Sequence, residues 1–307
     1  KKTYLLRNYI FIQKIMPESK MYNAMDFRNF SRINKLMRDY FQRQRGFIEV
    51  PAQSNRSILA ACEDPKTVGQ YIFCGKNYPL PQTGQIVLEE VLLQNPDVEG
   101  VFCQTTSFRD EPDPIPGRHD LIFQMFEFEG KGSIEDLKKT EKELLEHLGF
   151  EAPVSIDYEQ ACRKYGVETI GDKEEEKTKI DFGTSVSLEI FPKRSHPFWN
   201  MKYLGNNLFN KVDVLLYGME TIGSAERSCD PDEMLKFFNI VSNGEYKRLL
   251  FNGFTEERVM KELDFYLSLP MIPRYGAGIG MTRMERAMKL AGLLGEETKQ
   301  RIPEKVA

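Results

Sequence analysis

Two apolar stretches of the sequence, residues 101–111 and 121–130, flank a loop that is long, charged and rich in proline (DEPDPIPGRHD). If each stretch is a strand, successive side chains point to opposite faces. Phe102 and Phe108 then point toward a core. The opposite face carries Cys103, Thr105, Ser107, Arg109 and Glu111 on the first strand, and Phe123, Met125, Glu127 and Glu129 on the returning one. The stretch therefore predicts a hairpin with one apolar and one charged face.

That charged face is either wet or a polar site, because charges are not buried dry and unpaired. The strands alone are equally compatible with a solvated face that salt bridges stabilise. The loop favours a site, since it is longer than a hairpin needs and presents Arg118 and His119 together. Arginine is also well suited to phosphate recognition.

A second hairpin is predicted around Tyr217–Gly218, which separates Asp213 from Glu220. The two carboxylates would lie opposite or diagonal to each other and would repel. Either one of them is simply exposed, or a divalent cation binds between them. Mg²⁺ usually takes one or two carboxylates plus substrate phosphates. Arg227 follows, after small residues at 223–225 that leave room for a ligand.

A third feature is the run GAGIGMTR, in which Gly276, Gly278 and Gly280 alternate before Arg283. Alternating glycines remove the side chains from one face of a strand. Such bare backbone allows a flat or phosphorylated ligand to approach closely, although close packing against a neighbouring element is the commoner use. The spacing differs from the dinucleotide-binding fingerprint, and the sequence contains no P-loop.

Elsewhere, helices and strands follow one another without regular βαβ alternation, which favours an α+β domain around an antiparallel sheet. Asp26 is the expected N-cap of a helix at 26–44, and Ser133 with Asp136 forms a capping box before a helix that ends at Gly149. Further helices are expected near 83–95, 158–166, 231–240, 255–267 and 281–294, and strands near 47–51, 185–192 and 208–216.

Two further segments are expected at the surface. Residues 54–80 are broken by Gly, Pro and Asn and are expected to be irregular and surface-reaching. The charged run at 171–181 (GDKEEEKTKID) is expected to be a solvated surface segment.

Composition limits the classes of function. A net charge of −4 with 29% charged residues gives no global attraction to nucleic acid. Five scattered cysteines without a CxxC spacing argue against disulfides and a structural zinc site. No apolar stretch is long enough to cross a membrane, and the N-terminal residues fit a signal peptide poorly. We therefore expect a cytoplasmic protein.

The three features together resemble class II aminoacyl-tRNA synthetases, in particular the asparaginyl/aspartyl branch and its short asparagine-synthetase-like members. FRDE, RH and FQMFEFE resemble motif 2, GAGIGMTRMERA resembles motif 3, and residues 26–53 are similar to motif 1. The resemblance implies an extension at 1–25 and a catalytic domain at 26–307, with a helical, charged insertion at 131–180. It further implies an antiparallel sheet of six or seven strands flanked by helices, and a homodimer.

The same resemblance implies that ATP is bound with Mg²⁺ and that a carboxylate attacks the α-phosphate in line, stabilised by arginines and metal. The catalytic residues it implies are Arg109, Glu111 and Arg283, of which Arg109 would hold the α-phosphate and Arg283 would cover adenine. The other ATP-binding residues would be Arg118, His119, Phe123, Gly278 and Gly280. The amino acid would be bound by Glu63, Thr83, Gln85 and Arg227, and the metal by Asp213 and Glu220.

The sequence departs from the family pattern at several positions. Leu88 stands where aspartyl enzymes carry a lysine that reads the side chain, and Glu89 follows as in the asparaginyl type, which favours an amide substrate. Ile122 replaces the usual glutamate before the adenine-stacking phenylalanine. The motif 1 proline falls at Pro51 rather than at Gln53. Adenine binding and the dimer strand are therefore expected to differ from the usual pattern.

The largest departure lies ahead of motif 1, where about 25 residues stand in place of an anticodon-binding barrel. We therefore predict an ATP-dependent, AMP-forming ligase that activates aspartate, asparagine or a close analogue and transfers it to a non-tRNA acceptor such as ammonia. The alternatives are transfer to tRNA or another acceptor, and a non-catalytic regulator that binds an amino acid or a nucleotide. The full set of charged site residues argues against the regulator.

Overall fold

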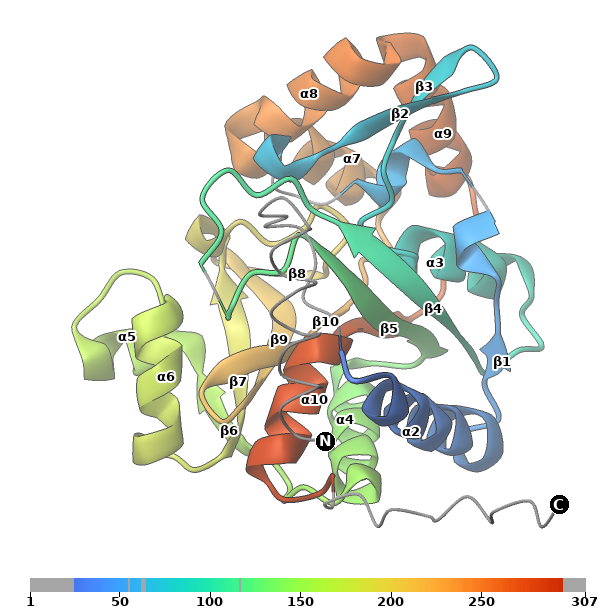
Figure 1. The fold of residues 1–307 in the computed structure, drawn as a ribbon. Coiled ribbons are helices and arrows are strands. Elements are labelled where there is room, and N and C mark those ends of the chain that lie inside the picture. Colours follow the sequence, from blue (N-terminus) through green and yellow to red (C-terminus); the bar gives the residue numbers. More distant parts are fainter. Residues whose placement is uncertain (1–24, 55, 62–64, 116, 295–307) are drawn as a thin grey trace, which may run out of the picture.

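The computed structural model describes residues 25–54, 56–61, 65–115 and 117–294 (Figure 1). A nine-stranded sheet forms its centre, in the order β1-β4-β5-β11-β10-β9-β7-β6, with β8 paired to β9. The strands are β1 (Ile48–Glu49), β4 (Gly100–Phe108), β5 (Ile122–Lys131), β6 (Val154–Asp157), β7 (Ser185–Pro192), β8 (Tyr203–Gly205), β9 (Leu208–Leu216), β10 (Met219–Glu226) and β11 (Arg274–Gly280).

The sheet is mixed, because β1–β4 and β6–β7 are parallel pairs at its two edges. All other neighbouring strands are antiparallel. The predicted α+β class is confirmed, and the sheet has more strands than the six or seven that the resemblance implied.

Helices cover both faces of the sheet (Figure 1). They are α2 (Phe27–Arg38), which continues as a π-helix over Asp39–Gln44, α3 (Gln85–Gln94), α4 (Ile134–Leu148), α5 (Tyr158–Tyr165), α6 (Asp172–Asp181), α7 (Pro231–Ile240), α8 (Glu245–Phe254), α9 (Glu256–Leu267) and α10 (Met281–Leu290). The predicted helix ends are confirmed at α2 and α4. The Asp26 side chain accepts hydrogen bonds from the first turn of α2, and α4 has its capping box and ends at Gly149 in the left-handed conformation.

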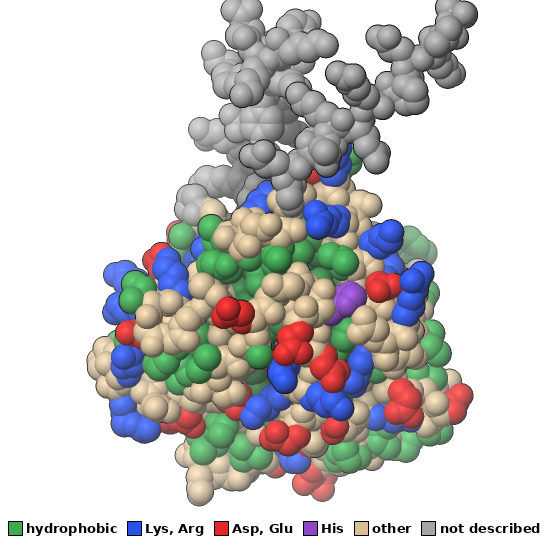
Figure 2. Space-filling view, turned by 90° about the horizontal axis from the view of Figure 1, so that it is seen from below, with side chains coloured by type: hydrophobic (Ala, Val, Ile, Leu, Met, Phe, Trp, Pro, Cys, Tyr) green, Lys and Arg blue, Asp and Glu red, His purple; other side chains and the backbone are tan. Residues whose placement is uncertain are grey.

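One face of the sheet packs against α2, α4 and α10 and forms the main apolar core. Phe102, Phe126 and Phe128 point into this core, as the alternation predicted, and surround Phe41 of the π-helix at ring-centroid distances of 4.7 to 5.9 Å. Figure 2 shows the outside of the molecule on the side of these helices. Acidic and basic side chains are interspersed there, and the described residues show no block of one sign.

The opposite face is only partly covered. Helices α3 and α7–α9 pack over one end of it around a second apolar core, in which Trp199 stands edge-on to Phe238 and Tyr266. The remainder of this face carries the polar side chains of β5, β10 and β11. The uncovered part of the sheet is therefore where a ligand has access to polar groups.

The prediction that residues 54–80 are irregular needs correction, and the prediction that the charged run is solvated needs it in part. Residues 54–80 contain a separate hairpin, β2 (Gln70–Phe73) and β3 (Lys76–Pro79), because Cys74 and Gly75 adopt left-handed conformations that form its turn. The charged run forms helix α6. Most of it is exposed, as predicted, but the prediction is wrong for Glu175, whose side chain is only 16% exposed because an arginine of the motif 2 loop compensates its charge.

Within the described residues, no helix combines the length and apolar character needed to span a membrane. The cysteines in this part of the chain (Cys74, Cys103, Cys162 and Cys229) are all free thiols.

Candidate active site

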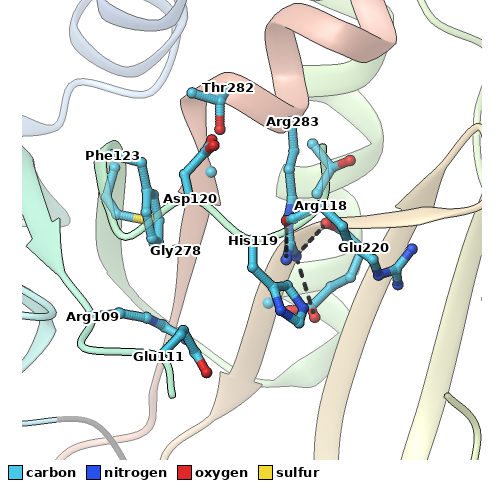
Figure 3. Close-up of a pocket in the computed structure, with 14 residues that line it drawn as sticks. Arg109, Glu111, Arg118, His119, Asp120, Phe123, Glu220, Gly278, Thr282 and Arg283 are labelled. Carbon is cyan, nitrogen blue, oxygen red and sulfur yellow. Dashed lines mark hydrogen bonds and ion pairs between the residues drawn. The ribbon is translucent and has the colours of Figure 1, made fainter. Parts of the chain in front are cut away.

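A cavity of about 130 Å³ lies on the uncovered face of the sheet (Figure 3). The sequence-predicted residues that line it are Arg109, Glu111, Arg118, His119, Phe123, Glu220, Gly278, Gly280 and Arg283. Asp120, Thr221 and Thr282 line it as well; no pattern in the sequence pointed to them. Arg118, His119, Arg283 and Glu220 gather on one side of the cavity and Arg109 and Phe123 on the other (Figure 3).

The β4–β5 hairpin positions Arg109 and Phe123. Its register pairs Ser107 with Phe123 and Cys103 with Glu127, so these side chains share the face that the alternation predicted. Arg109 follows the last residue of β4, and its backbone N–H donates to the Leu121 carbonyl at 2.8 Å. Its guanidinium carbon lies 5.7 Å from the centroid of the Phe123 ring. A cation and an aromatic ring therefore face the cavity together.

The loop between these strands folds back on itself and presents Arg118 and His119. The backbone N–H groups of both residues donate to the Ile115 carbonyl, at 3.1 and 2.9 Å, and Gly117 takes the left-handed conformation that the turn requires. Arg283 of α10 donates to the Arg118 carbonyl at 3.4 Å and to the Glu220 carbonyl at 2.8 Å. The loop is thereby tied to the motif 3 helix and to β10.

The β9–β10 hairpin brings Asp213 and Glu220 together, as the sequence predicted. Its turn has Tyr217 and Gly218 at φ of 52° and 72°. The register shifts by a bulge between Glu220 and Ile222, and Asp213 pairs with Gly223. A Cβ atom at Gly223 would lie 2.9 Å from Glu220 Oε1 and 3.7 Å from Asp213 Oδ1. Both carboxylates therefore lie close to the space that the missing side chain of Gly223 leaves.

The two carboxylates differ in their electrostatics. Burial raises the pKa of Asp213 to about 7; Lys211, which donates to Oδ2 at 2.5 Å, opposes this rise, and the charge of Glu220 adds to it. Burial also acts to raise the pKa of Glu220, but the nearby cations Lys211 and Arg283 outweigh it and lower the value. Glu220 is therefore the ionised partner at neutral pH.

This pair fits a divalent cation that also binds a ligand. Asp213 Oδ1 is buried and has no hydrogen-bond partner among the described residues. Within that same part of the chain, no group of three or more His, Cys, Asp or Glu side chains is arranged to hold a metal. Two carboxylates would leave most of the coordination shell of Mg²⁺ to water and phosphate oxygens, which is its usual arrangement.

The three glycines of β11 serve two purposes. A Cβ at Gly276 would lie 2.0 Å from Glu129 Oε1, so this glycine allows close packing of a buried side chain. Gly278 and Gly280 line the cavity instead. Gln85 of α3 reaches the same place, since its Nε2 atom would lie 3.8 Å from a Cβ at Gly278. Gly276 thus serves close packing, whereas the ligand reading of Gly278 and Gly280 stays a prediction.

Beside the cavity, Glu127 organises the segment that begins α3. It is fully buried and accepts hydrogen bonds from Thr83 Oγ1 at 2.5 Å, Thr105 Oγ1 at 2.5 Å and the Gly84 N–H at 2.8 Å. Burial raises the pKa of Glu127, and these hydrogen bonds oppose the rise. Thr83 thus stands at the edge of the site with its hydroxyl fixed. Glu63, predicted to contact the amino acid, lies outside the described residues.

Arg227 does not line the cavity. It is 3% exposed and pairs with Glu129 at 2.5 Å and with Glu89 at 3.7 Å. Glu89 also accepts hydrogen bonds from the side chains of Asn200 (2.7 Å), Tyr266 (2.6 Å) and Arg274 (2.8 Å). We call Glu89, Glu129, Arg227 and Arg274 the buried network. Arg274, Tyr266 and Asn200 come from distant segments, so only the fold brings them to Glu89.

Comparisons with known proteins agree with this geometry. The family model described as "tRNA synthetases class II (D, K and N)" matches residues 11–293, whereas no curated protein matches the chain. Asparaginyl-tRNA synthetase from Pyrococcus horikoshii, solved with asparaginyl-adenylate, is similar with a TM-score of 0.68 and 23% identity. The similarity covers 85% of this chain and 64% of that one.

Two further solved structures are similar. The asparaginyl-tRNA synthetase of Entamoeba histolytica with asparaginyl-adenylate gives a TM-score of 0.66 at 20% identity, over 86% of this chain and 63% of its own. A putative aspartyl-tRNA synthetase from Leishmania major Friedlin gives 0.63 at 17% identity, over 89% and 65%. The chain thus spans less than two thirds of the length of these proteins, and identities this low show a common fold. Because the family model matches most of the sequence, the chain belongs to the class II tRNA synthetases (D, K and N).

Proposed function

We propose that this protein activates aspartate, asparagine or a close analogue with ATP, forming an aminoacyl-adenylate and pyrophosphate. The observation that carries the proposal is the convergence of Arg109, Arg283 and Glu220 on one cavity beside an aromatic ring, with Asp213 next to Glu220 behind the lining residue Gly223. Arginines and a pair of carboxylates for a metal are the groups that phosphoryl chemistry requires.

In this proposal a carboxylate oxygen of the amino acid attacks the α-phosphorus of ATP, and the bond from that phosphorus to the bridging oxygen breaks. No protein nucleophile takes part. Arg109 holds the α-phosphate and the attacking carboxylate close together and stabilises the charge that develops between them. Phe123 and Arg283 flank adenine, and Arg118 and His119 bind the outer phosphates. Asp213 and Glu220 would hold Mg²⁺, which neutralises phosphate charge when bound.

The amino acid would occupy the space between Thr83, Gln85 and the buried network. Thr83 and Gln85 lie next to the cavity, where the α-amino group of a substrate would be held, and Arg227 would read its side chain. Glu89 lies 3.7 Å from Arg227, so an acceptor and a donor stand close together. A terminal amide, which has one donor and one acceptor group, complements such a pair. We therefore propose an amide or another non-aspartate substrate ahead of aspartate.

For the acyl acceptor we propose ammonia or another small molecule, following the resemblance to the short asparagine-synthetase-like members of the family. Ammonia would form asparagine only from aspartate, through its side-chain carboxylate, because an amide substrate has only its α-carboxylate to activate. Transfer to tRNA is the alternative. A homodimer built through the motif 1 segment is part of the same proposal.

The test is amino-acid-dependent exchange of pyrophosphate into ATP, screened over all amino acids with and without tRNA. We expect exchange with asparagine, aspartate or a close analogue and without tRNA. Absence of exchange with every amino acid would favour a non-catalytic binding protein. If exchange occurs, product analysis with added ammonium, and separately with tRNA, identifies the acceptor.

A further inference from the structure

Helix α6 holds the Arg118 side chain. Arg118 Nε forms an ion pair with Asp172 Oδ1 at 2.5 Å, and its Nη2 donates to Glu175 Oε2. The arginine side chain is 13% exposed and that of Glu175 is 16% exposed. We call Asp172 and Glu175 the α6 clasp. A residue proposed to bind the outer phosphates of ATP is thus already bound to two carboxylates of its own chain.

The clasp is built on a fixed backbone contact. Gly218, in the β9–β10 turn, lies against α6 so closely that a Cβ there would be 2.8 Å from Glu176 Cα. Glu175 Oε2 also accepts from the Glu220 backbone N–H at 3.3 Å. One carboxylate therefore connects α6, the motif 2 loop and the strand that carries a proposed metal ligand. These contacts place the clasp at the phosphate end of the cavity.

Two observations indicate that this arrangement opposes phosphate binding. Both carboxylates of the clasp lie on the guanidinium that is proposed to face the outer phosphates, so a polyanion has to displace them from Arg118. The cavity of about 130 Å³ is also smaller than the ~300–1,000 Å³ of typical ligand sites. For ATP to bind there, the cavity would have to widen and the Arg118 guanidinium would have to leave its two carboxylates.

We propose that the α6 clasp is an autoinhibitory contact that competes with the outer phosphates of ATP for Arg118. This inference rests on the proposed ATP site. When ATP binds, phosphate oxygens replace the carboxylates of Asp172 and Glu175 around the guanidinium, and α6 loosens from the motif 2 loop. The free energy needed to open the clasp weakens ATP binding by the same amount. The clasp therefore raises the ATP concentration at which the site is half occupied.

The test is the affinity for ATP with Mg²⁺, measured by titration calorimetry without amino acid. The double variant Asp172→Asn/Glu175→Gln keeps the size of both side chains and removes their charge. We expect it to bind ATP about tenfold more tightly than the unmodified protein. Glu176→Gln is the matched control, because Glu176 lies on the same helix and pairs with Lys179 at 3.1 Å rather than with Arg118. Its ATP affinity is expected to stay within about twofold of the unmodified protein.

A double-variant cycle assigns the effect to Arg118. In an Arg118→Ala background the two clasp substitutions should no longer tighten ATP binding. Hydrogen exchange of residues 172–181 should become faster when ATP binds to the unmodified protein, since the clasp opens. The autoinhibition proposal is wrong if the double variant binds ATP no more tightly than the unmodified protein. It is also wrong if hydrogen exchange of residues 172–181 becomes slower when ATP binds. If neither the unmodified protein nor the double variant binds ATP, the proposed function fails and the clasp fails with it.

Discussion

Two polar clusters share one face of the sheet, and they differ in how their charges are paired. In the buried network, Glu89, Glu129, Arg227 and Arg274 are each at most 3% exposed and are joined to one another by ion pairs. Around the cavity, by contrast, Arg283 and Glu220 have side chains that are 30% and 37% exposed and lie 3.7 Å apart.

This difference indicates different roles. A fully buried ion pair is costly to break, because the remaining partner stays in a medium of low dielectric constant without compensation. A half-exposed charge is screened by water and contributes little to stability, but it becomes strong when a ligand excludes that water. We therefore expect substitutions in the network to lower stability, with an added effect on substrate binding at Arg227 and Glu89, and substitutions at the cavity to affect binding and catalysis with little effect on stability.

The largest effect is expected for Arg274→Met, which removes one cation of the network. Arg274 is fully buried and bonds Glu89 at 2.8 Å and Tyr266 at 2.7 Å. Its loss should lower the free energy of unfolding by about 3–5 kcal/mol, as measured by urea denaturation. A loss below about 1 kcal/mol would show that the network is not what stabilises this end of the sheet.

Arg109→Ala should affect activity rather than stability. We expect pyrophosphate exchange to fall at least about 100-fold, since one preorganised donor at a developing charge contributes that much. The free energy of unfolding should change by no more than about 0.5 kcal/mol. Urea denaturation and pyrophosphate exchange should both be measured on Arg274→Met and on Arg109→Ala. If the two variants lose the same free energy of unfolding, the proposed difference between the buried network and the cavity is wrong. Full activity in Arg109→Ala would mean that the proposed site is wrong.

Much of the site could be predicted because local pattern determines it. Period-2 alternation placed Phe102 in the core and Glu127 on the polar face, and the Tyr217–Gly218 turn placed Asp213 beside Glu220. These inferences need only the geometry of a strand and of a two-residue turn. The bulge between Glu220 and Ile222 was not predictable, because nothing in the sequence distinguishes it from regular pairing.

The contacts that the sequence did not reveal are those between segments far apart in the chain. Glu175 is 57 residues from Arg118, and in the sequence it is one of several similar acids in a charged run. The run has only a weak helical amphipathic pattern, so no local signal shows which acid turns inward. Likewise, Arg274 meets Glu89 across 185 residues. Such pairings depend on how the elements pack, and a single sequence does not contain that information.

Asp213→Asn should have an effect of intermediate size, which appears only in the Mg²⁺ requirement of pyrophosphate exchange. Asparagine keeps the size and one oxygen but removes the charge that would bind Mg²⁺. We expect the Mg²⁺ concentration for half-maximal exchange to rise about tenfold, equivalent to about 1.4 kcal/mol. Glu226→Gln is the matched control, since Glu226 is a buried acid of β10 paired with Lys202 at 2.7 Å, outside the cavity lining. An unchanged Mg²⁺ requirement in Asp213→Asn would show that the metal binds elsewhere.

The smallest effect is expected for Lys211→Met, and it tests why the two carboxylates differ. Burial raises the pKa of Asp213 to about 7, so below that pH the carboxyl is protonated and does not bind a cation. Exchange activity should therefore rise as the pH increases through about 7. Lys211 opposes the effect of burial, and without it the pKa of Asp213 should be higher still. The acidic limb of the pH profile should then move to higher pH by about one unit.

Lys202→Met is the matched control for that shift, because Lys202 pairs with Glu226 rather than with a cavity carboxylate. Its pH profile should match that of the unmodified protein. If the acidic limb of Lys211→Met stays in place or moves to lower pH, Asp213 is not the group that sets it. The contrast between the two clusters would then be limited to their exposure to water.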